Sequence, residues 1–333
     1  MLCARLYRWY EANKRVLPWR ETTDPYKIWV SEIILQQTRV QQGLEYYMRF
    51  VERFPTVLAM AEATEDDVLR LWQGLGYYTR ARNMYKGAQM IMQRWNGVFP
   101  TAFEDIRALP GVGEYTAGAI AGFAYNQPYP ALDGNVYRVL ARLNDCEEVF
   151  DTTAGKKHFH ALAEKILDRT HPRLFNSAIM ELGALQCVPR EPDCEVCPLL
   201  DFCLAYAHHT VNLLPVRKPR PAVLDRELNY AVYLCPQTNP QGQTIIYTLL
   251  RQRTEKDIWQ HLWEFPQQNP PFASSQRELT FTHILSHRRL HATFRIYPVS
   301  ALPAIPDTIV VSWEELDEYA LSRLTLRALQ ALE

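Results

Sequence analysis

The sequence predicts an all-α N-terminal half followed by a smaller α+β half. Apolar residues recur at helical spacing from the first residue to about residue 205, whereas beyond residue 227 they follow strand-like patterns. A proline-rich, basic stretch, 207–227, lies between the two patterns and predicts a linker. A chain of 333 residues is long enough for two domains, each with its own core.

The first half reads as a succession of helices. Residues 1–15 are amphipathic, and Asp24 followed by Pro25 is typical of a helix start, because aspartate caps free N–H groups and proline suits the first turn. From Tyr26 to Phe54 the apolar residues keep helical spacing, which predicts one long helix. Further helices are predicted at 65–72, 79–95, 102–108, 114–125, 134–143, 154–168 and 173–186.

The second half begins with a predicted β-hairpin. Its strands, 228–235 and 244–253, flank the turn-rich segment PQTNPQGQ. A second pair of strands is expected at 279–287 and 290–299, and the tail from residue 315 to 333 has the pattern of an amphipathic helix.

The charge balance limits how the chain could bind nucleic acid. The net charge is −1 and the isoelectric point is near 6.8, which disfavours non-specific coating of DNA. Any DNA-binding surface must then be a local patch of basic side chains. Four arginines of the first half could form such a patch, or they could simply form solvated helix faces. No apolar run approaches a membrane span, so we expect a cytoplasmic protein. The candidate arginines are Arg80, Arg82, Arg138 and Arg142.

The segment 109–133 carries the strongest functional signal. Gly111 and Gly113 form a Gly-x-Gly turn before a helix of small residues, and Asp133 follows about twenty residues later. Bare N–H groups at such a turn and the positive end of the helix suit a DNA phosphate. The alternative is a plain helix–turn–helix whose glycines only permit tight geometry.

Four of the seven cysteines crowd into 17 residues with the spacing Cys-x6-Cys-x2-Cys-x5-Cys. Structural zinc sites usually draw on two well-separated pairs, so all-thiolate ligation in one loop favours a four-iron cluster over zinc. Such a cluster could be a structural staple or a redox sensor. The candidate ligands are Cys187, Cys194, Cys197 and Cys203.

Two carboxylates suggest a glycosidase reaction. Glu32 sits on an otherwise apolar helix, where burial would raise its pKa and suit a general acid, although a surface glutamate is the simpler alternative. Asp133 could stabilise an oxocarbenium-like sugar. An enzyme that cleaves an N-glycosidic bond in DNA must extrude the nucleotide, and Leu75 and Tyr77 could fill the vacated space or merely pack on the core.

No lysine occurs between Lys86 and Lys156. A glycosylase that also cuts the backbone needs an amine near the hairpin to form a Schiff base, and Tyr115 stands at that place instead. A phenol cannot form the imine but can hydrogen-bond and tune a carboxylate. The sequence therefore predicts base hydrolysis without efficient strand cleavage, and no covalent adduct on borohydride trapping.

These residues together resemble the MutY-type adenine DNA glycosylases of the helix-hairpin-helix superfamily. The resemblance runs from about Leu17 to Cys203. The segments that carry it are LPWR, PYKIWVSEIILQQT, LWQGLGYYTRARN, LPGVGEYTAGAI, LDGNVYRVLAR, FNSAIMELGALQC and the four cysteines.

The resemblance implies removal of adenine mispaired with 8-oxoguanine. The glutamate matched by Glu32 protonates adenine, and the aspartate matched by Asp133 stabilises the sugar cation or bonds to it transiently. Tyr115 and Asn135 match residues that organise this aspartate. Trp19 and Arg20 match positions near the extruded adenine, whereas Gln37, Thr38, Leu75 and Tyr77 match positions beside the oxidised guanine.

The second half resembles the Nudix-like domain with which such enzymes recognise the lesion. DIWQHLWEFP matches its Trp- and Pro-bearing segment, but the clustered glutamates of a Nudix hydrolase are absent, so no pyrophosphatase activity is expected. Ser286 and His287 match a Phe-Ser-His loop over the lesion, in which Leu285 replaces the phenylalanine. Ser177 stands where the family has Gln or Glu, so the adenine pocket is expected to be held differently.

The resemblance also implies a domain organisation. Residues 1–22 and 134–206 would form the iron–sulfur cluster subdomain, 23–133 a six-helix subdomain with the hairpin, 207–227 the linker and 228–333 the lesion-recognition domain. We expect a [4Fe-4S] cofactor and a monomer that acts on double-stranded DNA containing 8-oxoguanine:A or G:A, associated with the bacterial nucleoid. The alternatives are a pyrimidine or thymine-mismatch glycosylase of the same superfamily and a non-catalytic iron–sulfur redox sensor.

Overall fold

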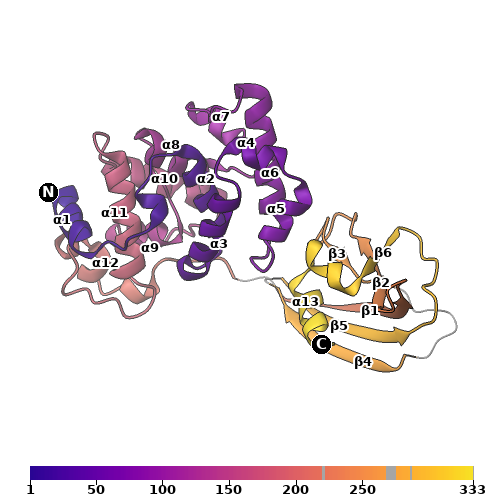
Figure 1. Ribbon diagram of the computed structural model, residues 1–333. Helices are drawn as coiled ribbons and strands as arrows, with labels where there is room; N and C mark the ends of the chain where they lie inside the picture. Colours follow the sequence, from indigo (N-terminus) through magenta and orange to yellow (C-terminus); the bar gives the residue numbers. More distant parts are fainter. Residues whose placement is uncertain (220–221, 268–274, 286, 333) are drawn as a thin grey trace. The chain divides into compact units, whose positions relative to one another are not determined.

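The computed structural model describes residues 1–219, 222–267, 275–285 and 287–332 (Figure 1). Contacts divide the chain into two compact units, Met1–Ala61 with Lys86–Pro219, and Glu62–Tyr85 with Arg220–Glu333. The second unit thus takes up 62–85, which the sequence-based division groups with 23–133. That division into subdomains remains a prediction.

Helices make up the first unit, and most lie where the sequence predicts them. The short helix α4 and the one-turn α12 are additional. The helix α6 crosses the boundary at residue 85. The bounds are α1 Leu2–Asn13, α2 Pro25–Leu35, α3 Val40–Arg53, α4 Val57–Glu62, α6 Thr79–Trp95, α7 Phe103–Arg107, α8 Glu114–Tyr125, α9 Gly134–Leu143, α10 Thr153–Ile166, α11 Pro172–Leu185 and α12 Leu204–Ala207.

The single long helix predicted from Tyr26 to Phe54 is wrong. Asp24 caps α2 as expected, accepting from the Tyr26 N–H at 2.9 Å. The helix then ends at Leu35, and Gln37 has a left-handed φ of 58°. After this turn the chain continues as α3 in a new direction. The prediction failed because the apolar periodicity of two consecutive helices looks continuous in sequence. The break places Gln37 and Thr38 in the turn.

The small residues of α8 allow close packing in the core of this unit. A Cβ added at Gly118 would lie 2.9 Å from the Pro130 carbonyl oxygen, and one at Gly122 would lie 2.8 Å from Asn176 Nδ2. The helix therefore approaches the 129–131 segment, which leads directly to Asp133 at the start of α9, more closely than side chains would permit.

The second unit contains a sheet with the strand order β3-β2-β1-β5-β4, and β6 pairs with β2. The predicted hairpin and the second predicted pair of strands are both present as antiparallel pairs, β1 with β2 and β4 with β5. The parallel pairing of β1 with β5 and the strands β3 and β6 were not predicted. The strands are β1 Leu224–Thr238, β2 Thr244–Gln252, β3 Trp263–Glu264, β4 Arg277–Ile284, β5 Arg288–Pro298 and β6 Thr308–Ser312.

The tail is helical only at its end. The segment Trp313–Glu318 forms 3-10 turns, and Ser322 then caps α13, Arg323–Gln330, by accepting from the Thr325 N–H at 3.1 Å. The apolar residues of α13 pack with the sheet in one hydrophobic core. Helix α5, Glu65–Leu71, also belongs to this unit.

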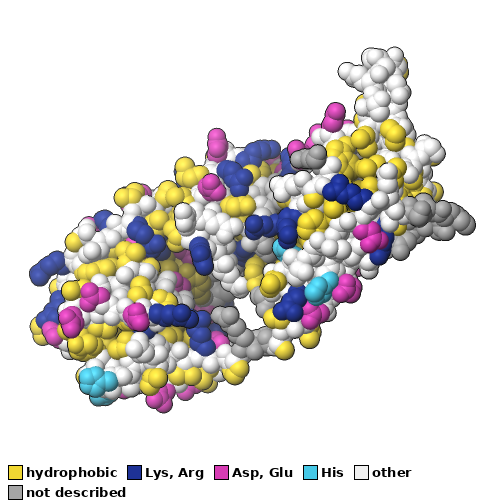
Figure 2. All heavy atoms as spheres, turned by 90° about the horizontal axis from the view of Figure 1, so that it is seen from below, with side chains coloured by type: hydrophobic (Ala, Val, Ile, Leu, Met, Phe, Trp, Pro, Cys, Tyr) yellow, Lys and Arg dark blue, Asp and Glu magenta, His cyan; other side chains and the backbone are white. Residues whose placement is uncertain are grey.

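Acidic and basic side chains intermingle on the face shown in Figure 2, in keeping with the near-zero net charge. Several arginines proposed for a DNA-binding patch are instead buried: Arg82, Arg138 and Arg142 are at most 8% exposed. That prediction is wrong for these three because their guanidinium groups satisfy backbone carbonyl groups inside the fold. Among the described helices, none is long and apolar enough to cross a membrane.

Candidate active site

A cavity of about 530 Å³ opens in the first unit where α2, α8, α9 and α11 meet the segment 15–20. It brings together residues that are far apart in the sequence. Of the predicted site residues, Trp19, Arg20, Glu32, Gln37, Thr38, Tyr115, Asp133 and Asn135 line it.

Glu32 is the most deeply buried acid of this cavity, at 4% exposure on α2. The Tyr115 hydroxyl donates to its Oε2 at 2.8 Å, and Arg20 Nη1 lies 3.9 Å from Oε1. Burial raises the pKa of Glu32, with Asp133 adding to the rise, while Arg20 and the Tyr115 hydrogen bond oppose it. This is the environment of a carboxylic acid that keeps its proton toward neutral pH.

The surroundings of Asp133 differ from those of Glu32, because several N–H groups donate hydrogen bonds to its carboxylate. It caps α9, accepting from the N–H groups of Asn135 and Val136 at 2.9 and 2.8 Å, and from Asn135 Nδ2 at 2.8 Å. Burial raises the pKa of Asp133, and these three hydrogen bonds oppose the rise. The N-terminus of the helix also favours a negative charge. Between the two acids, Asp133 is the better-supported carboxylate.

Tyr115 is bonded to Glu32 and not to Asp133, the acid that the resemblance assigns to it. Asn135 does hold Asp133, and its own Oδ1 accepts from Arg138 Nη2 at 2.9 Å. Arg138 in turn donates to the Cys187 carbonyl at 2.7 Å and the Gly183 carbonyl at 2.6 Å. The start of α9 is thereby fastened to the beginning of the cysteine-bearing segment.

Arg20 and Trp19 lie on a short 3-10 turn, Pro18–Arg20. The Arg20 guanidinium stacks over Phe123, 3.9 Å from the ring centroid, which fixes its plane beside the cavity. Trp19 is 2% exposed and packs edge-on against Tyr47.

Glu181 and Arg15 are cavity residues that sequence reasoning missed. Arg15 donates two hydrogen bonds to the Glu181 carboxylate, from Nε to Oε1 at 2.7 Å and from Nη2 to Oε2 at 2.8 Å. The signal was available, because Glu181 is an acid on an apolar helix, just as Glu32 is.

The hairpin glycines have the geometry that their spacing predicts. Gly111 has a φ of 75°, and Gly113 is the N-cap residue of α8. A Cβ at Gly113 would meet no heavy atom within 4 Å, so the backbone is open to a ligand on that side. Neither glycine is among the residues that line the 530 Å³ cavity.

The four clustered cysteines line one small cavity of about 30 Å³, with Arg142 Nη1 3.3 Å from Cys187 Sγ. In the described part of the chain, no three His, Cys, Asp or Glu side chains converge closely enough for a single metal ion. Thiolates alone are the donor set of iron–sulfur clusters, so the chemistry of the four cysteines that line this cavity fits such a group.

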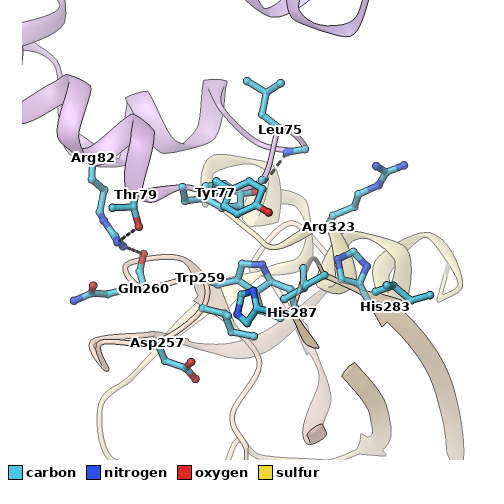
Figure 3. Close-up of a pocket in the computed structure, with 16 residues that line it drawn as sticks. Leu75, Tyr77, Thr79, Arg82, Asp257, Trp259, Gln260, His283, His287 and Arg323 are labelled. Carbon is cyan, nitrogen blue, oxygen red and sulfur yellow. Dashed lines mark hydrogen bonds between the residues drawn. The ribbon is translucent and has the colours of Figure 1, made fainter. Parts of the chain in front are cut away.

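The second unit has a cavity of about 460 Å³ between the 74–82 segment and the loops of the sheet. The predicted residues Leu75, Tyr77 and His287 line it (Figure 3). Gly74, Gly76 and Tyr77 have positive φ angles of 97°, 75° and 49°, so the turn is tightly wound. Ser286 lies outside the described residues.

Comparisons with known proteins agree with this architecture. Residues 30–169 match the HhH-GPD superfamily of base excision DNA repair proteins, and 238–331 match the NUDIX domain. The adenine DNA glycosylase of Buchnera aphidicola (subsp. Baizongia pistaciae) is 33% identical over 308 residues, covering 88% of this chain and 84% of that protein. The mouse adenine DNA glycosylase is 38% identical over 235 residues, covering 68% of this chain and 46% of that protein.

Two solved structures share the helical fold. A thermostable thymine-DNA glycosylase is 26% identical with a TM-score of 0.57, covering 62% of this chain and 95% of that one. Endonuclease III bound to DNA is 22% identical with a TM-score of 0.54, covering 62% of this chain and 94% of that one. The predicted helix-hairpin-helix core with a Nudix-like second half is confirmed.

Proposed function

Because the chain belongs to the adenine DNA glycosylases of the HhH-GPD superfamily, we propose that it excises adenine paired with 8-oxoguanine and, more slowly, with guanine. The enzyme is a base excision repair glycosylase that hydrolyses the N-glycosyl bond of adenine. The main support for a mechanism with two acidic residues is that Glu32 and Asp133, 101 positions apart in the sequence, line the same cavity.

Glu32 acts as the general acid. It donates its proton to the extruded adenine, and the bond between the base and C1′ breaks with its electron pair leaving on adenine. A neutral leaving group is far better than an anion, so the proton must be held until the base is in place. The buried position of Glu32 supports this role because burial favours the protonated carboxyl.

Asp133 stabilises the positive sugar until water adds to C1′, and the proton released by water returns to Glu32. Three N–H donors fix the Asp133 carboxylate at the start of α9. Asn135 positions it, Tyr115 orients Glu32, and Arg20 and Trp19 form the wall beside the adenine.

The remaining DNA contacts that we propose come from turns and loops of the chain. Gly111 and Gly113 offer N–H groups of the hairpin to a phosphate, supported by the open space at Gly113. Gln37 and Thr38, in the turn after α2, lie beside the oxidised guanine. Leu75 and Tyr77, on the tight 74–77 turn, fill the space that the extruded adenine vacates, and together with His287 they read the oxidised guanine.

Cys187, Cys194, Cys197 and Cys203 would hold a [4Fe-4S] cluster, supported by the shared thiol-lined cavity. The cluster would supply four covalent links that shape the 187–203 loop and no step of the hydrolysis. Purified protein should be brown and contain iron; a colourless protein loaded with zinc would contradict the assignment. We expect the protein to act as a monomer on double-stranded DNA in the cytoplasm.

The deciding experiment is a glycosylase assay on paired oligonucleotides, with hot alkali to reveal abasic sites. Adenine opposite 8-oxoguanine should be excised faster than adenine opposite guanine, and T:G or an oxidised pyrimidine should not be processed. Equal rates on both adenine pairs would contradict the proposed lesion preference, and excision from T:G would favour the thymine-mismatch alternative.

The roles of the two acids are tested in the same assay. Glu32→Gln and Asp133→Asn should each lower the single-turnover rate by about 100-fold or more. Asn can still cap α9, so Asp133→Asn keeps the fold. The matched control is Asp24→Asn, the same change at the cap of α2, which should leave the rate unchanged.

A further inference from the structure

The cavity of the second unit has a large aromatic wall residue, Trp259, to which the proposed function gives no role. Trp259 lines it from the loop between β2 and β3, together with His283 from β4. The two rings lie 5.9 Å apart between centroids and are tilted by 59°. In Figure 3, Trp259 and His287 face Tyr77, which comes from the opposite side of the cavity.

The loop that presents Trp259 is strained. Trp259 and His261 both have left-handed φ angles, 59° and 67°, which residues with a side chain rarely adopt. Such conformations persist only where surrounding contacts hold them, and they concentrate at functional positions.

Three contacts from α5 and the start of α6 hold this loop. Arg82 Nη1 donates to the Gln260 carbonyl, and His261 Nδ1 pairs with the Glu65 carboxylate. Beside them, Trp263 Nε1 donates to Asp66 Oδ2 at 3.2 Å. These contacts come from both sides of the 74–79 turn that carries Leu75 and Tyr77. The two walls of the cavity are therefore fastened to each other within the second unit.

The chemistry of the cavity suits a flat heteroaromatic group. Its volume of about 460 Å³ lies within the usual range of small-ligand sites. The indole face is apolar, and burial together with Arg327 and Arg323 lowers the pKa of His283, so the neighbouring imidazole is neutral. Arg323, which is exposed, adds a cation at the cavity, as a nucleotide phosphate would require.

We propose that Trp259 is a specificity-determining residue whose indole stacks on the purine opposite the excised adenine. The inference rests on the proposed function, because it takes this cavity as the place where the opposite base is read. Stacking on an aromatic side chain accepts any base plane and adds affinity without hydrogen bonds. The Glu65–His261 and Arg82–Gln260 contacts act as a latch that keeps the indole in place.

The test compares two duplexes that bind the full-length protein, one with 8-oxoguanine and one with an abasic analogue, each opposite a non-hydrolysable analogue of adenine that the enzyme cannot excise. The quantity measured is the ratio of the two dissociation constants at fixed salt. Trp259→Ala should reduce the preference for the purine-containing duplex on the order of 10-fold, and Trp259→Phe should keep most of it. An unchanged ratio in Trp259→Ala would overturn the proposal.

The matched control is Trp313→Leu in the same unit. Trp313 packs on Phe265 and does not line the cavity, so its loss should leave the ratio unchanged. An equal fall in Trp313→Leu would mean general loosening of the unit and would also overturn the proposal.

A third duplex with guanine opposite the same adenine analogue separates this inference from the proposed lesion reading. If the wild type binds guanine and 8-oxoguanine duplexes equally but still prefers a purine to the abasic analogue, lesion reading fails and the role of Trp259 stands. If it shows no preference for a purine, both fail.

A separate set of variants tests whether the latch contacts are needed for the purine preference. His261→Gly relieves the backbone strain and removes the ion pair, and Glu65→Gln removes only the pair; each should lower the purine preference. The double variant should lower it no further, because the two residues form one contact. His291→Asn breaks a comparable pair with Asp225 on the sheet and should have no effect. Full preference in His261→Gly would rule out the latch.

Discussion

Glu32 and Asp133 face one cavity but differ in how their charge is accommodated. Asp133 has three N–H donors and a helix N-terminus, whereas Glu32 has one hydroxyl and an arginine at 3.9 Å. The pKa of each is raised by burial, yet only Asp133 has enough donors to carry a charge comfortably. This asymmetry supports the proposal that Glu32 is the general acid and Asp133 the carboxylate.

A buried acid of this kind lowers stability at neutral pH. The folded pKa of Glu32 lies above its unfolded value, so stability is full below the unfolded pKa and is lost as the pH rises through the folded one. Glu32→Gln removes this loss. We expect its melting temperature at pH 7 to exceed that of the wild type by a few degrees, and the difference to vanish below about pH 4.

Thermal unfolding followed by circular dichroism between pH 4 and pH 8 measures this. The exposed Glu104→Gln serves as control and should match the wild type throughout. A lower melting temperature of Glu32→Gln at pH 7 would show that the ionised Glu32 stabilises the fold.

Tyr115 affects the pKa of Glu32. Its hydrogen bond lowers the pKa of Glu32, so Tyr115→Phe should raise that pKa further and keep Glu32 protonated to higher pH. The alkaline limb of the kcat/KM profile should then move to higher pH. Tyr125→Phe, whose hydroxyl bonds the distant Phe99 carbonyl, should leave the limb in place. A shift of the limb toward lower pH would mean that the Tyr115 hydroxyl favours the protonated form of Glu32.

The first turn of α9 links the catalytic cavity to the cysteine loop. Arg138, 4% exposed, donates to Asn135, Gly183 and Cys187 at once. A Cβ at Gly183 would lie 2.7 Å from that of Asn135, so α11 and α9 touch directly at this point. The position of Asp133 is therefore determined by both helices and by the loop that follows α11.

Arg138→Met tests this linkage. It leaves buried oxygen acceptors without donors, so the free energy of unfolding should fall on the order of 3 kcal/mol in urea. The excision rate should fall as well, because Asn135 loses the contact that orients its side chain. The control is Arg107→Met at an exposed pair with Glu104, which should change stability by less than about 0.5 kcal/mol. Wild-type stability of Arg138→Met would contradict the account.

Among the described residues that line the catalytic cavity, the cationic side chains are arginines. Arg15 and Arg20 line it, and none of its described lining residues is a lysine. A guanidinium stays protonated and does not form an imine. We therefore predict that the enzyme hydrolyses the base without efficient cleavage of the DNA backbone.

Borohydride trapping measures this directly. The wild type should give no covalent DNA adduct on an 8-oxoguanine:A duplex while excising adenine normally. Tyr115→Lys places an amine in the cavity and provides the positive control. A robust wild-type adduct would mean that an amine outside the described lining residues reaches the sugar.

Much of the fold was predictable because it is encoded locally. Caps at Asp24 and Asp133, helical spacing and turn-rich segments all act within a few residues, so most helices and both pairs of strands lie where expected. The failures have equally local causes. The turn at Gln36–Arg39 carries no proline or glycine to signal it, and the tail from 315 keeps its apolar spacing through 3-10 turns.

The sequence alone determined the candidate residue types of the site, because a glutamate on an apolar helix, a lone aspartate after the hairpin and four crowded cysteines each have few chemical uses. Only the tertiary structure decided which of them meet. It paired Tyr115 with Glu32 across 83 positions, turned Arg138 and Arg142 inward, and placed 62–85 with the sheet. Those outcomes depend on how helices pack at a distance, and no short-range pattern records that geometry.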